Sequence, residues 1–250
     1  MAAQEWRNVE VTLVLPAYNE STMIEQAVFK SFNELDKITP NYEVIIAEDG
    51  STDGTDVITK RLTNVYDSLI HLHSDERLGR GKAIKGAFKA AHGRILAYMD
   101  VDLATDVSHL GQLIGSIREG FDISIGSRTH PESTIERSWQ RSLTSRLYNG
   151  FVNLLLKTDL HDHQCGFKAF KKDSIISIID DIEDEHWFWD TEVLAIGIRR
   201  GLRVKEIPIT WIEAKGTKVN LFKDSISMML KTLHLWWRIQ NYSYLSVKQI

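Results

Sequence analysis

The chain has 250 residues, of which 43% are hydrophobic and 26% are charged. This composition is typical of a folded soluble protein and excludes disordered, collagen-like and low-complexity chains. The single cysteine, Cys165, excludes an internal disulfide and a cysteine-rich zinc site, and it fits a cytosolic setting. Residues 1–7 lack the apolar stretch of a secretory signal, and no run of eighteen apolar residues occurs. We therefore expect neither secretion nor a membrane span.

The net charge of −4 is unevenly distributed along the chain. Residues 1–198 hold 20 basic and 31 acidic side chains, whereas residues 199–250 hold 10 basic and 3 acidic ones. A basic tail behind an acidic body indicates either an anionic partner for the tail or chance clustering on a solvated face.

The first half of the chain alternates strand and helix patterns. Short apolar or β-branched runs predict strands at 9–15, 43–47, 69–72 and 94–99. Helical patterns follow them at 22–35, where Ser21 is the expected N-cap, then through Val57, Ile58 and Leu62, and at 81–91. This alternation predicts an α/β fold with a mostly parallel central sheet and helices on both faces.

The second half continues the pattern and adds two amphipathic segments. We expect a strand at 123–126, a long amphipathic stretch at 136–157 and a helix at 191–199. A strand at 204–211 contains Pro208, which indicates a sheet edge or a bulge. The segment 222–239 is predicted as an amphipathic helix. Residues 1–220 are expected to form the main domain, and 221–250 a C-terminal amphipathic helix and tail.

Acidic segments follow three of the predicted strands, at 16–20, 48–53 and 100–102. In open α/β sheets, ligands bind outside the carboxyl ends of the strands, so these segments should meet at one edge. Their charges would repel one another unless a cation or a ligand rich in hydrogen-bond donors lies there. The carboxylates of Asp100 and Asp102 suit Mg²⁺ or Mn²⁺. A solvated turn is the alternative for this pair.

The segment Gly79-Arg80-Gly81-Lys82 opens a predicted helix. Glycine allows close backbone approach, and a helix N-terminus with basic side chains attracts phosphate. The segment lacks the spacing of a P-loop, and no G-x-G-x-x-G motif opens the first helix, so a dinucleotide cofactor is disfavoured. A plain surface turn is the alternative.

Three motifs together carry a family resemblance: Pro16-Ala17-Tyr18-Asn19-Glu20, the segment 48–55 (EDGSTDGT) and Asp100-Val101-Asp102. They resemble the motif series of family 2 inverting glycosyltransferases, which have the GT-A fold. The segments 126–128, 136–138, 162–168 and 189–192 resemble those of polyprenyl-phosphate sugar synthases, in particular the dolichyl-phosphate glucosyltransferase-like branch with its archaeal relatives. The resemblance covers about residues 11–220.

This resemblance implies a role for each matching position. Asp100 and Asp102, which flank Val101, would hold a metal ion that bridges the donor diphosphate, and Lys82 lies in the phosphate-attracting turn. From its residue type rather than from the resemblance, either Asp190 or Glu192 is a candidate for hydrogen bonds to sugar hydroxyls. The acceptor phosphate would be bound by Arg128 and Arg141. The base and ribose of a nucleotide diphosphate sugar would be held by Pro16, Tyr18, Glu20 and Asp49, and a late loop closing over the site would contribute Lys215 and Lys218.

One position departs from the mannosyl branch of this family. That branch often has a glutamine two residues after the second aspartate, where this chain has Ala104. The departure points away from a mannosyl enzyme and leaves the third protein ligand of the metal open, with Thr105 or Asp106 as candidates. A metal site of His161, His163 and Cys165 lacks the usual ligand spacing and is disfavoured.

The acceptor decides which catalytic groups are needed. A phosphate monoester is largely ionised at pH 7 and needs positive charge rather than a general base. The chain offers Arg128, Arg137, Arg141 and Arg146 after one predicted strand. A hydroxyl acceptor would require a base, for which Asp190 and Glu192 are the candidates. A non-enzymatic nucleotide-sugar sensor is the third alternative.

A polyprenyl or dolichyl phosphate acceptor lies in a bilayer, so we expect peripheral binding to the cytoplasmic face of a membrane. The segments 136–157 and 222–239 carry the tryptophan, apolar and basic residues of interfacial helices. Burial of their apolar faces in the core or in a homo-oligomer interface is the alternative. The product would be a lipid-phosphate hexose or N-acetylhexosamine for glycan assembly, with a UDP-sugar as the expected donor. No nucleic acid partner is expected.

Overall fold

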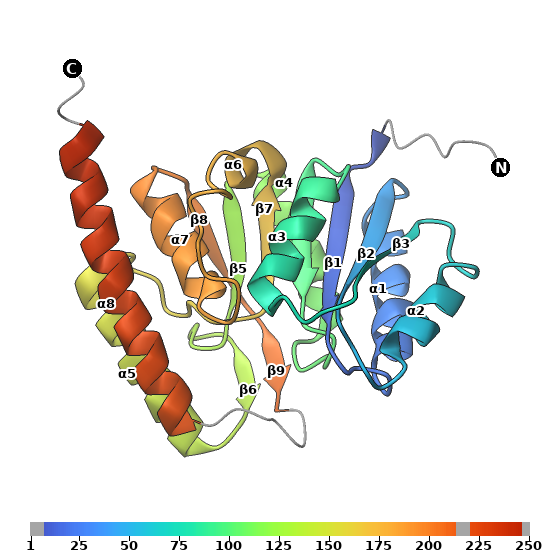
Figure 1. Cartoon of the computed structure of the whole chain (residues 1–250), viewed down its shortest axis with the longest axis horizontal. Helices are drawn as coiled ribbons and strands as arrows, with labels where there is room; N and C mark the ends of the chain where they lie inside the picture. Colours follow the sequence, from blue (N-terminus) through green and yellow to red (C-terminus); the bar gives the residue numbers. More distant parts are fainter. Residues whose placement is uncertain (1–7, 214–220, 247–250) are drawn as a thin grey trace.

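The computed structural model describes residues 8–213 and 221–246. Its main sheet has seven strands in the order β3-β2-β1-β4-β7-β5-β8, and a small second sheet pairs β6 with β9 (Figure 1). The strands of the main sheet are β1 (Val11–Ala17), β2 (Tyr42–Asp49), β3 (Leu69–Ser74), β4 (Ile95–Met99), β5 (Ile123–Ser127), β7 (Phe167–Lys171) and β8 (Val204–Pro208).

Helices cover both faces of this sheet, as expected (Figure 1). They are α1 (Ile24–Ile38), α2 (Thr55–Leu62), α3 (Arg80–Ala90), α4 (Leu110–Arg118), α5 (Trp139–Leu156), α6 (Lys172–Ile176), α7 (Trp189–Arg199) and α8 (Leu221–Ser246), with a short 3-10 turn η2 at Val107–His109.

The prediction of a mostly parallel sheet is confirmed, with one exception. β1 pairs in parallel with both β2 and β4, whereas β7 lies antiparallel between β4 and β5. β7 was not predicted from the sequence. Its sequence FKAFK carries lysine at two of five positions and does not have the continuous apolar character of a central strand.

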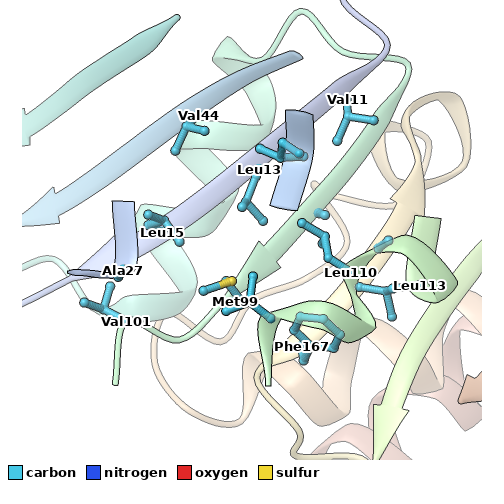
Figure 2. Close-up of a cluster of buried hydrophobic side chains, with 14 of the residues drawn as sticks. Val11, Leu13, Leu15, Ala27, Val44, Met99, Val101, Leu110, Leu113 and Phe167 are labelled. Atoms are coloured by element: carbon cyan, nitrogen blue, oxygen red, sulfur yellow. The ribbon is translucent and has the colours of Figure 1, made fainter. Parts of the chain in front are cut away.

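The core lies on both faces of the sheet because alternate residues of each strand point to opposite sides. Val11, Leu13 and Leu15 of β1 belong to one buried cluster, whereas Val14 belongs to the other. Figure 2 shows the first cluster, in which these side chains lie among residues of α1, α4 and β7. Burial on both faces explains why β1 reads as an unbroken apolar run.

Two predicted boundaries were wrong. The N-cap of α1 is Met23 and not Ser21, whose backbone N–H instead donates to Asp53 Oδ2 at 3.0 Å. The predicted strand at 204–211 is divided after Pro208, because β8 pairs with β5 whereas β9 (Thr210–Ile212) pairs with β6 (Thr134–Glu136). The edge position expected for Pro208 is confirmed, since β8 is the last strand of the sheet.

The two amphipathic segments form α5 and α8, which lie side by side at the end of the domain farthest from β3 (Figure 1). Met228, Thr232 and Leu235 form the buried side of α8. Arg238 of the same helix forms ion pairs with Glu183 and Glu192. Within the described residues, no helix combines the length and apolarity required to cross a membrane.

Candidate active site

The strand order points to the carboxyl ends of β1 and β4 as the expected ligand-binding crevice of this fold. From β1 the chain proceeds to β2 and β3 on one side, and then returns to β4 on the other side. Such a reversal leaves a gap between the loops, where ligands of open α/β sheets bind. Pro16 lies near the end of β1, Asp49 at the end of β2, and Asp100 directly after β4. The three acidic segments therefore do meet along one edge of the sheet.

The loops after β1 and β2 are joined by hydrogen bonds. The Asn19 backbone N–H donates to Ser51 Oγ at 3.0 Å, and the Thr52 N–H donates to Asn19 Oδ1 at 2.8 Å. The Glu20 N–H donates to Thr55 Oγ1 at 2.9 Å. The two motifs therefore form one hydrogen-bonded wall of the crevice, on the side expected to hold the donor base.

Tyr18 extends this wall through a contact that the sequence analysis missed. The guanidinium carbon of Arg77 lies 3.9 Å from the centroid of the Tyr18 ring, which is the geometry of a cation–π interaction. A stacked tyrosine and arginine offer flat surfaces and N–H donors to a planar ligand. Nothing in the sequence spacing indicated Arg77, because the pairing depends on the path of the loop after β3.

Asp49 holds the loop that leads into α3. Its Oδ1 accepts from the Leu78 N–H at 2.6 Å, and its Oδ2 accepts from the Gly79 N–H at 2.9 Å. Gly79 has a φ of 112°, and a Cβ there would overlap the backbone of Glu185. The Asp49 carboxylate is thus a buried anchor for the glycine-containing turn, whose Lys82 forms an exposed ion pair with Glu185 at 3.1 Å.

Asp100 and Asp102 form the acidic centre of the crevice. Val101 between them is buried in the core (Figure 2), whereas Asp100 and Asp102 are only partly buried in the turn after β4. Asp102 Oδ1 accepts from the Ala104 N–H at 3.0 Å. Burial raises the pKa of Asp102, and the negative charge of Asp100 raises it further.

These two residues fit a divalent metal ion. The raised pKa of Asp102 indicates that Arg80 does not fully compensate its negative charge, and oxygen donors are the ligands that Mg²⁺ and Mn²⁺ prefer. Gly166 contributes to the arrangement, because the Asp100 N–H donates to its carbonyl at 3.0 Å and a Cβ on Gly166 would overlap the Asp100 carboxylate. Only glycine allows β7 to approach the motif so closely.

Arg80 joins this centre to a buried charge network. Its Nε and Nη2 donate to Asp100 Oδ1 at 3.0 and 2.7 Å, and its Nη1 donates to Asp190 Oδ2 at 2.7 Å. Lys168, which is fully buried on β7, donates to Asp190 Oδ1 at 2.6 Å, and the Tyr98 hydroxyl donates to the same oxygen. Burial alone would raise the pKa of Asp190, but Lys168 and Arg80 hold it below its ordinary value.

The predicted sugar contact Asp190 is therefore a buried carboxylate that positions Arg80 and Lys168 in this structure. Its buried partners Tyr98 and Lys168 were not predicted from the sequence. A lysine within the otherwise apolar run Phe167-Lys168-Ala169-Phe170 was the available signal. Glu192, the other candidate base, accepts from the N–H groups of Glu183 and Asp184 at 3.2 and 2.7 Å and contacts Arg238.

The predicted acceptor arginines lie after β5 and in α5. Arg128 donates from Nε and Nη2 to the buried Asp162 at 2.7 and 2.9 Å, and this pairing holds the pKa of Asp162 well below its ordinary value despite burial. Arg141 forms an ion pair with Glu213. Burial lowers the pKa of Arg137, and the positive charges of Arg128 and Arg146 lower it further, although Asp162 and Glu213 counteract them. We call Arg128, Arg137 and Arg146 the cationic cluster, in which Arg128 is paired with Asp162.

The remaining candidates have varied surroundings. His163 is buried between Thr158 and Asn149, and burial lowers its pKa to about 4, so its imidazole is neutral and already hydrogen-bonded. Of the three aromatic residues before Asp190, Phe188 and Trp189 are in the core, whereas Trp187 is exposed. Lys215 and Lys218 lie outside the described residues.

The sheet order, the crevice and the acidic centre define a GT-A glycosyltransferase fold. Solved structures of this class superpose on the chain. A glucosyl-3-phosphoglycerate synthase from Mycobacterium tuberculosis, in complex with Mn²⁺, UDP and phosphoglyceric acid, matches with a TM-score of 0.69 and 16% identity, over 92% of this chain and 78% of that one. A Pyrobaculum calidifontis mannosyltransferase with GDP-Man and Mn²⁺ matches with a TM-score of 0.59 and 17% identity, over 97% of this chain and 77% of that one.

The sequence identifies the family within this class: the chain belongs to glycosyl transferase family 2, whose model matches residues 12–179. It is 46% identical over 241 residues to the glycosyltransferase AglD of Haloferax volcanii. The match covers 95% of this chain but only 39% of AglD. It is 29% identical over 245 residues to the dolichyl-phosphate beta-glucosyltransferase of Saccharomyces cerevisiae, covering 90% of this chain and 73% of the relative. The resemblance read from the motifs is confirmed.

Proposed function

We propose that this protein is a metal-dependent inverting glycosyltransferase. It moves a hexose or N-acetylhexosamine from a UDP-sugar to dolichyl or another polyprenyl phosphate, giving a lipid-phosphate sugar for glycan assembly. The observation that carries this proposal is the pair Asp100 and Asp102 at the crevice of a GT-A sheet, together with the cationic cluster of Arg128, Arg137 and Arg146 in the same half of the fold. The names of the yeast and Dictyostelium relatives, both dolichyl-phosphate beta-glucosyltransferases, support the acceptor.

On the donor side, the chain binds and orients the nucleotide. The wall formed by the loops after β1 and β2, with Tyr18 against Arg77, would hold the base. Asp100 and Asp102 would hold Mg²⁺ or Mn²⁺, which when bound stabilises the negative charge that develops on the leaving diphosphate. Arg80, anchored between Asp100 and Asp190, keeps a further positive charge beside the same position.

On the acceptor side, the network around Asp190 favours a phosphate over a hydroxyl. A general base works best when its pKa lies near the working pH, and the pKa of Asp190 is held low by two cations. An acceptor phosphate with a second pKa of about 6 needs no base at pH 7. It needs guanidinium groups, which match its geometry and are supplied by the cationic cluster.

The membrane contact is proposed for the outer faces of α5 and α8. Large apolar side chains are exposed on both helices, including Trp139, Leu143, Leu147 and Leu154 on α5 and Leu230, Leu233, Trp236 and Trp237 on α8. Tryptophan and leucine beside basic residues are typical of peripheral binding at a bilayer interface. In this proposal the protein binds the cytoplasmic face of the membrane, where a lipid phosphate is within reach of the arginines.

The reaction can be tested directly with radiolabelled UDP-glucose and GDP-mannose, a short polyprenyl phosphate, and Mg²⁺ or Mn²⁺. The expected result is organic-extractable label from the UDP-sugar that disappears with EDTA and in Asp102→Asn. A suitable control is Asp180→Asn, which changes an exposed carboxylate near Lys85 and Lys89. Label that persists without metal, or no transfer from any nucleotide sugar to a lipid phosphate, would contradict the proposal.

A further inference from the structure

A second cluster of metal-ligating side chains lies at the opposite edge of the sheet from α5 and α8. β3 is the terminal strand of the sheet, and it carries His71 and His73 (Figure 1). Residues two apart in a strand project from the same face, so both imidazoles share one side of β3. Their ring centroids lie 5.7 Å apart.

Glu48 completes the cluster from the neighbouring strand. In the parallel register Glu48 is the partner of His73, and Ile46 is the partner of His71. The Glu48 side chain is fully buried, and its Oε2 contacts His73 Nδ1. One ligand atom from each of the three residues lies within 4.8 Å of the other two.

The surroundings of these atoms resemble those of a metal site. His71 Nε2 is buried and has no hydrogen-bond partner among the described residues. A buried ring nitrogen without a partner is costly, and a metal ion would satisfy it. His73 contacts Glu48 through Nδ1 and Asp75 through Nε2 at 3.3 Å. A carboxylate on the second ring nitrogen is the usual device that orients a metal-binding histidine.

We infer that Glu48, His71 and His73 form a transition-metal site of the zinc type at the β2–β3 edge. Two imidazoles and one carboxylate suit Zn²⁺, which takes nitrogen and oxygen ligands at tetrahedral positions and leaves one position for water. The same set disfavours Mg²⁺, which prefers oxygen ligands alone. The site is chemically distinct from the all-oxygen pair Asp100 and Asp102.

Glu48 also binds the loop after β2, so a metal ion on Glu48 would affect that loop. Its Oε1 accepts the backbone N–H of Ser51, and Ser51 Oγ accepts the N–H of Asn19. An ion at the Glu48 site would therefore fix the loop after β2 and, through it, the loop after β1. The role assigned here is structural, and it holds whether or not the protein transfers sugar.

The test is calorimetric titration of the metal-free, full-length chain with Zn²⁺ in excess Mg²⁺. One zinc ion per chain is expected, with binding weakened at least about tenfold in His71→Ala and in His73→Ala. The matched control is His92→Ala, because His92 Nδ1 contacts the buried Glu43 at 2.9 Å, yet among the described residues His92 belongs to no group of three potential metal ligands. Asp102→Asn serves as the control for the acidic centre, and both controls should bind zinc as the parent does.

A Co²⁺ spectrum keeps the test decisive where an alanine variant folds poorly. The parent protein is expected to give the visible absorption bands of tetrahedral Co²⁺, which excess Zn²⁺ abolishes and which His71→Asn lacks. The inference is overturned if the parent binds no zinc, if His71→Ala and His73→Ala bind it as the parent does, or if His92→Ala loses as much affinity as they do.

Discussion

At the scale of single residues, the buried charge network is the feature with the largest expected energetic effect. Lys168 is fully buried and donates to Asp190, which also contacts Arg80 and Tyr98. Removing one partner of a buried ion pair leaves the other uncompensated, so Lys168→Ala should lower the free energy of unfolding by about 3–5 kcal/mol. Urea denaturation measures this loss.

The exposed pair of Lys37 and Glu34 provides the control, since Lys37→Ala should change the free energy of unfolding by less than about 1 kcal/mol. Equal effects in the two variants would show that the network contributes no more than a surface pair.

Gly166 tests the close approach of β7 to the acidic centre. A methyl group at this position would overlap the Asp100 carboxylate, so Gly166→Ala should displace Asp100 and weaken Mn²⁺ binding at least about tenfold. Gly150→Ala in α5 is the matched control, because a Cβ there meets nothing within 4 Å. In that helix alanine should stabilise the protein by about 0.5–1 kcal/mol. Titration followed by Mn²⁺ electron paramagnetic resonance gives the comparison, and unchanged Mn²⁺ affinity in Gly166→Ala would refute the argument.

Asp102 links function to the pH dependence of stability. Burial and Asp100 raise its pKa in the folded state above the unfolded value of 3.8. The folded state therefore binds this proton more tightly, and the stability contributed by the site falls as pH rises through the raised pKa. Without metal, Asp102→Asn should be more stable than the parent at pH 7 and equally stable well below pH 3.8. Thermal melts in EDTA across this pH range measure the difference in stability between Asp102→Asn and the parent. If the variant is less stable than the parent at pH 7, the ionised Asp102 carboxylate does not destabilise the folded state.

At the scale of elements, α8 has two faces with different expected roles. Leu235 is 1% exposed, so Leu235→Ala should cost about 2–5 kcal/mol of unfolding free energy. Leu230 on the same helix is 62% exposed, so Leu230→Ala should leave stability nearly unchanged while reducing flotation with anionic liposomes. The two substitutions remove the same atoms from opposite sides of one helix. A protein that never floats with liposomes, or that floats equally well with Leu230→Ala, would contradict the membrane contact.

Elements with clean periodicity were predictable from the sequence, and those defined by tertiary pairing were not. β1, β2 and β4 read as apolar runs because both of their faces are buried. β7 was missed because Lys168 is neutralised by Asp190, which lies 22 residues away in the chain. The division of 204–211 into β8 and β9 was also missed, since it depends on β6 offering a second partner.

In the candidate site too, the residues with a local sequence pattern were predictable, whereas the contacts that depend on tertiary pairing were not. Asp100, Asp102 and the loops after β1 and β2 could be placed from strand ends and motif spacing. The contacts of Arg77 with Tyr18 and of Arg80 with Asp100 and Asp190 could not, because they depend on how the loop after β3 folds back. Local patterns thus located the crevice, whereas its internal pairing required the structure.

At the scale of the whole molecule, the fold separates the proposed tasks. β3 lies at one end of the sheet and α5 and α8 lie at the other (Figure 1). β1 and β4, whose carboxyl ends carry acidic segments, lie between them in the strand order. The cationic cluster lies between the crevice and α5, since Arg128 follows β5 and Arg146 is in α5. A donor held near β1 and β2 and an acceptor arriving along α5 would therefore meet near Asp100 and Asp102.

The most direct test of this account is a crystal structure of the protein with Mn²⁺ and a UDP-sugar, in which anomalous scattering locates the manganese. The account predicts a manganese peak bound by Asp100 and Asp102, with the diphosphate on it and the base against Tyr18. A manganese peak elsewhere, or a diphosphate remote from Asp102, would contradict the central claim.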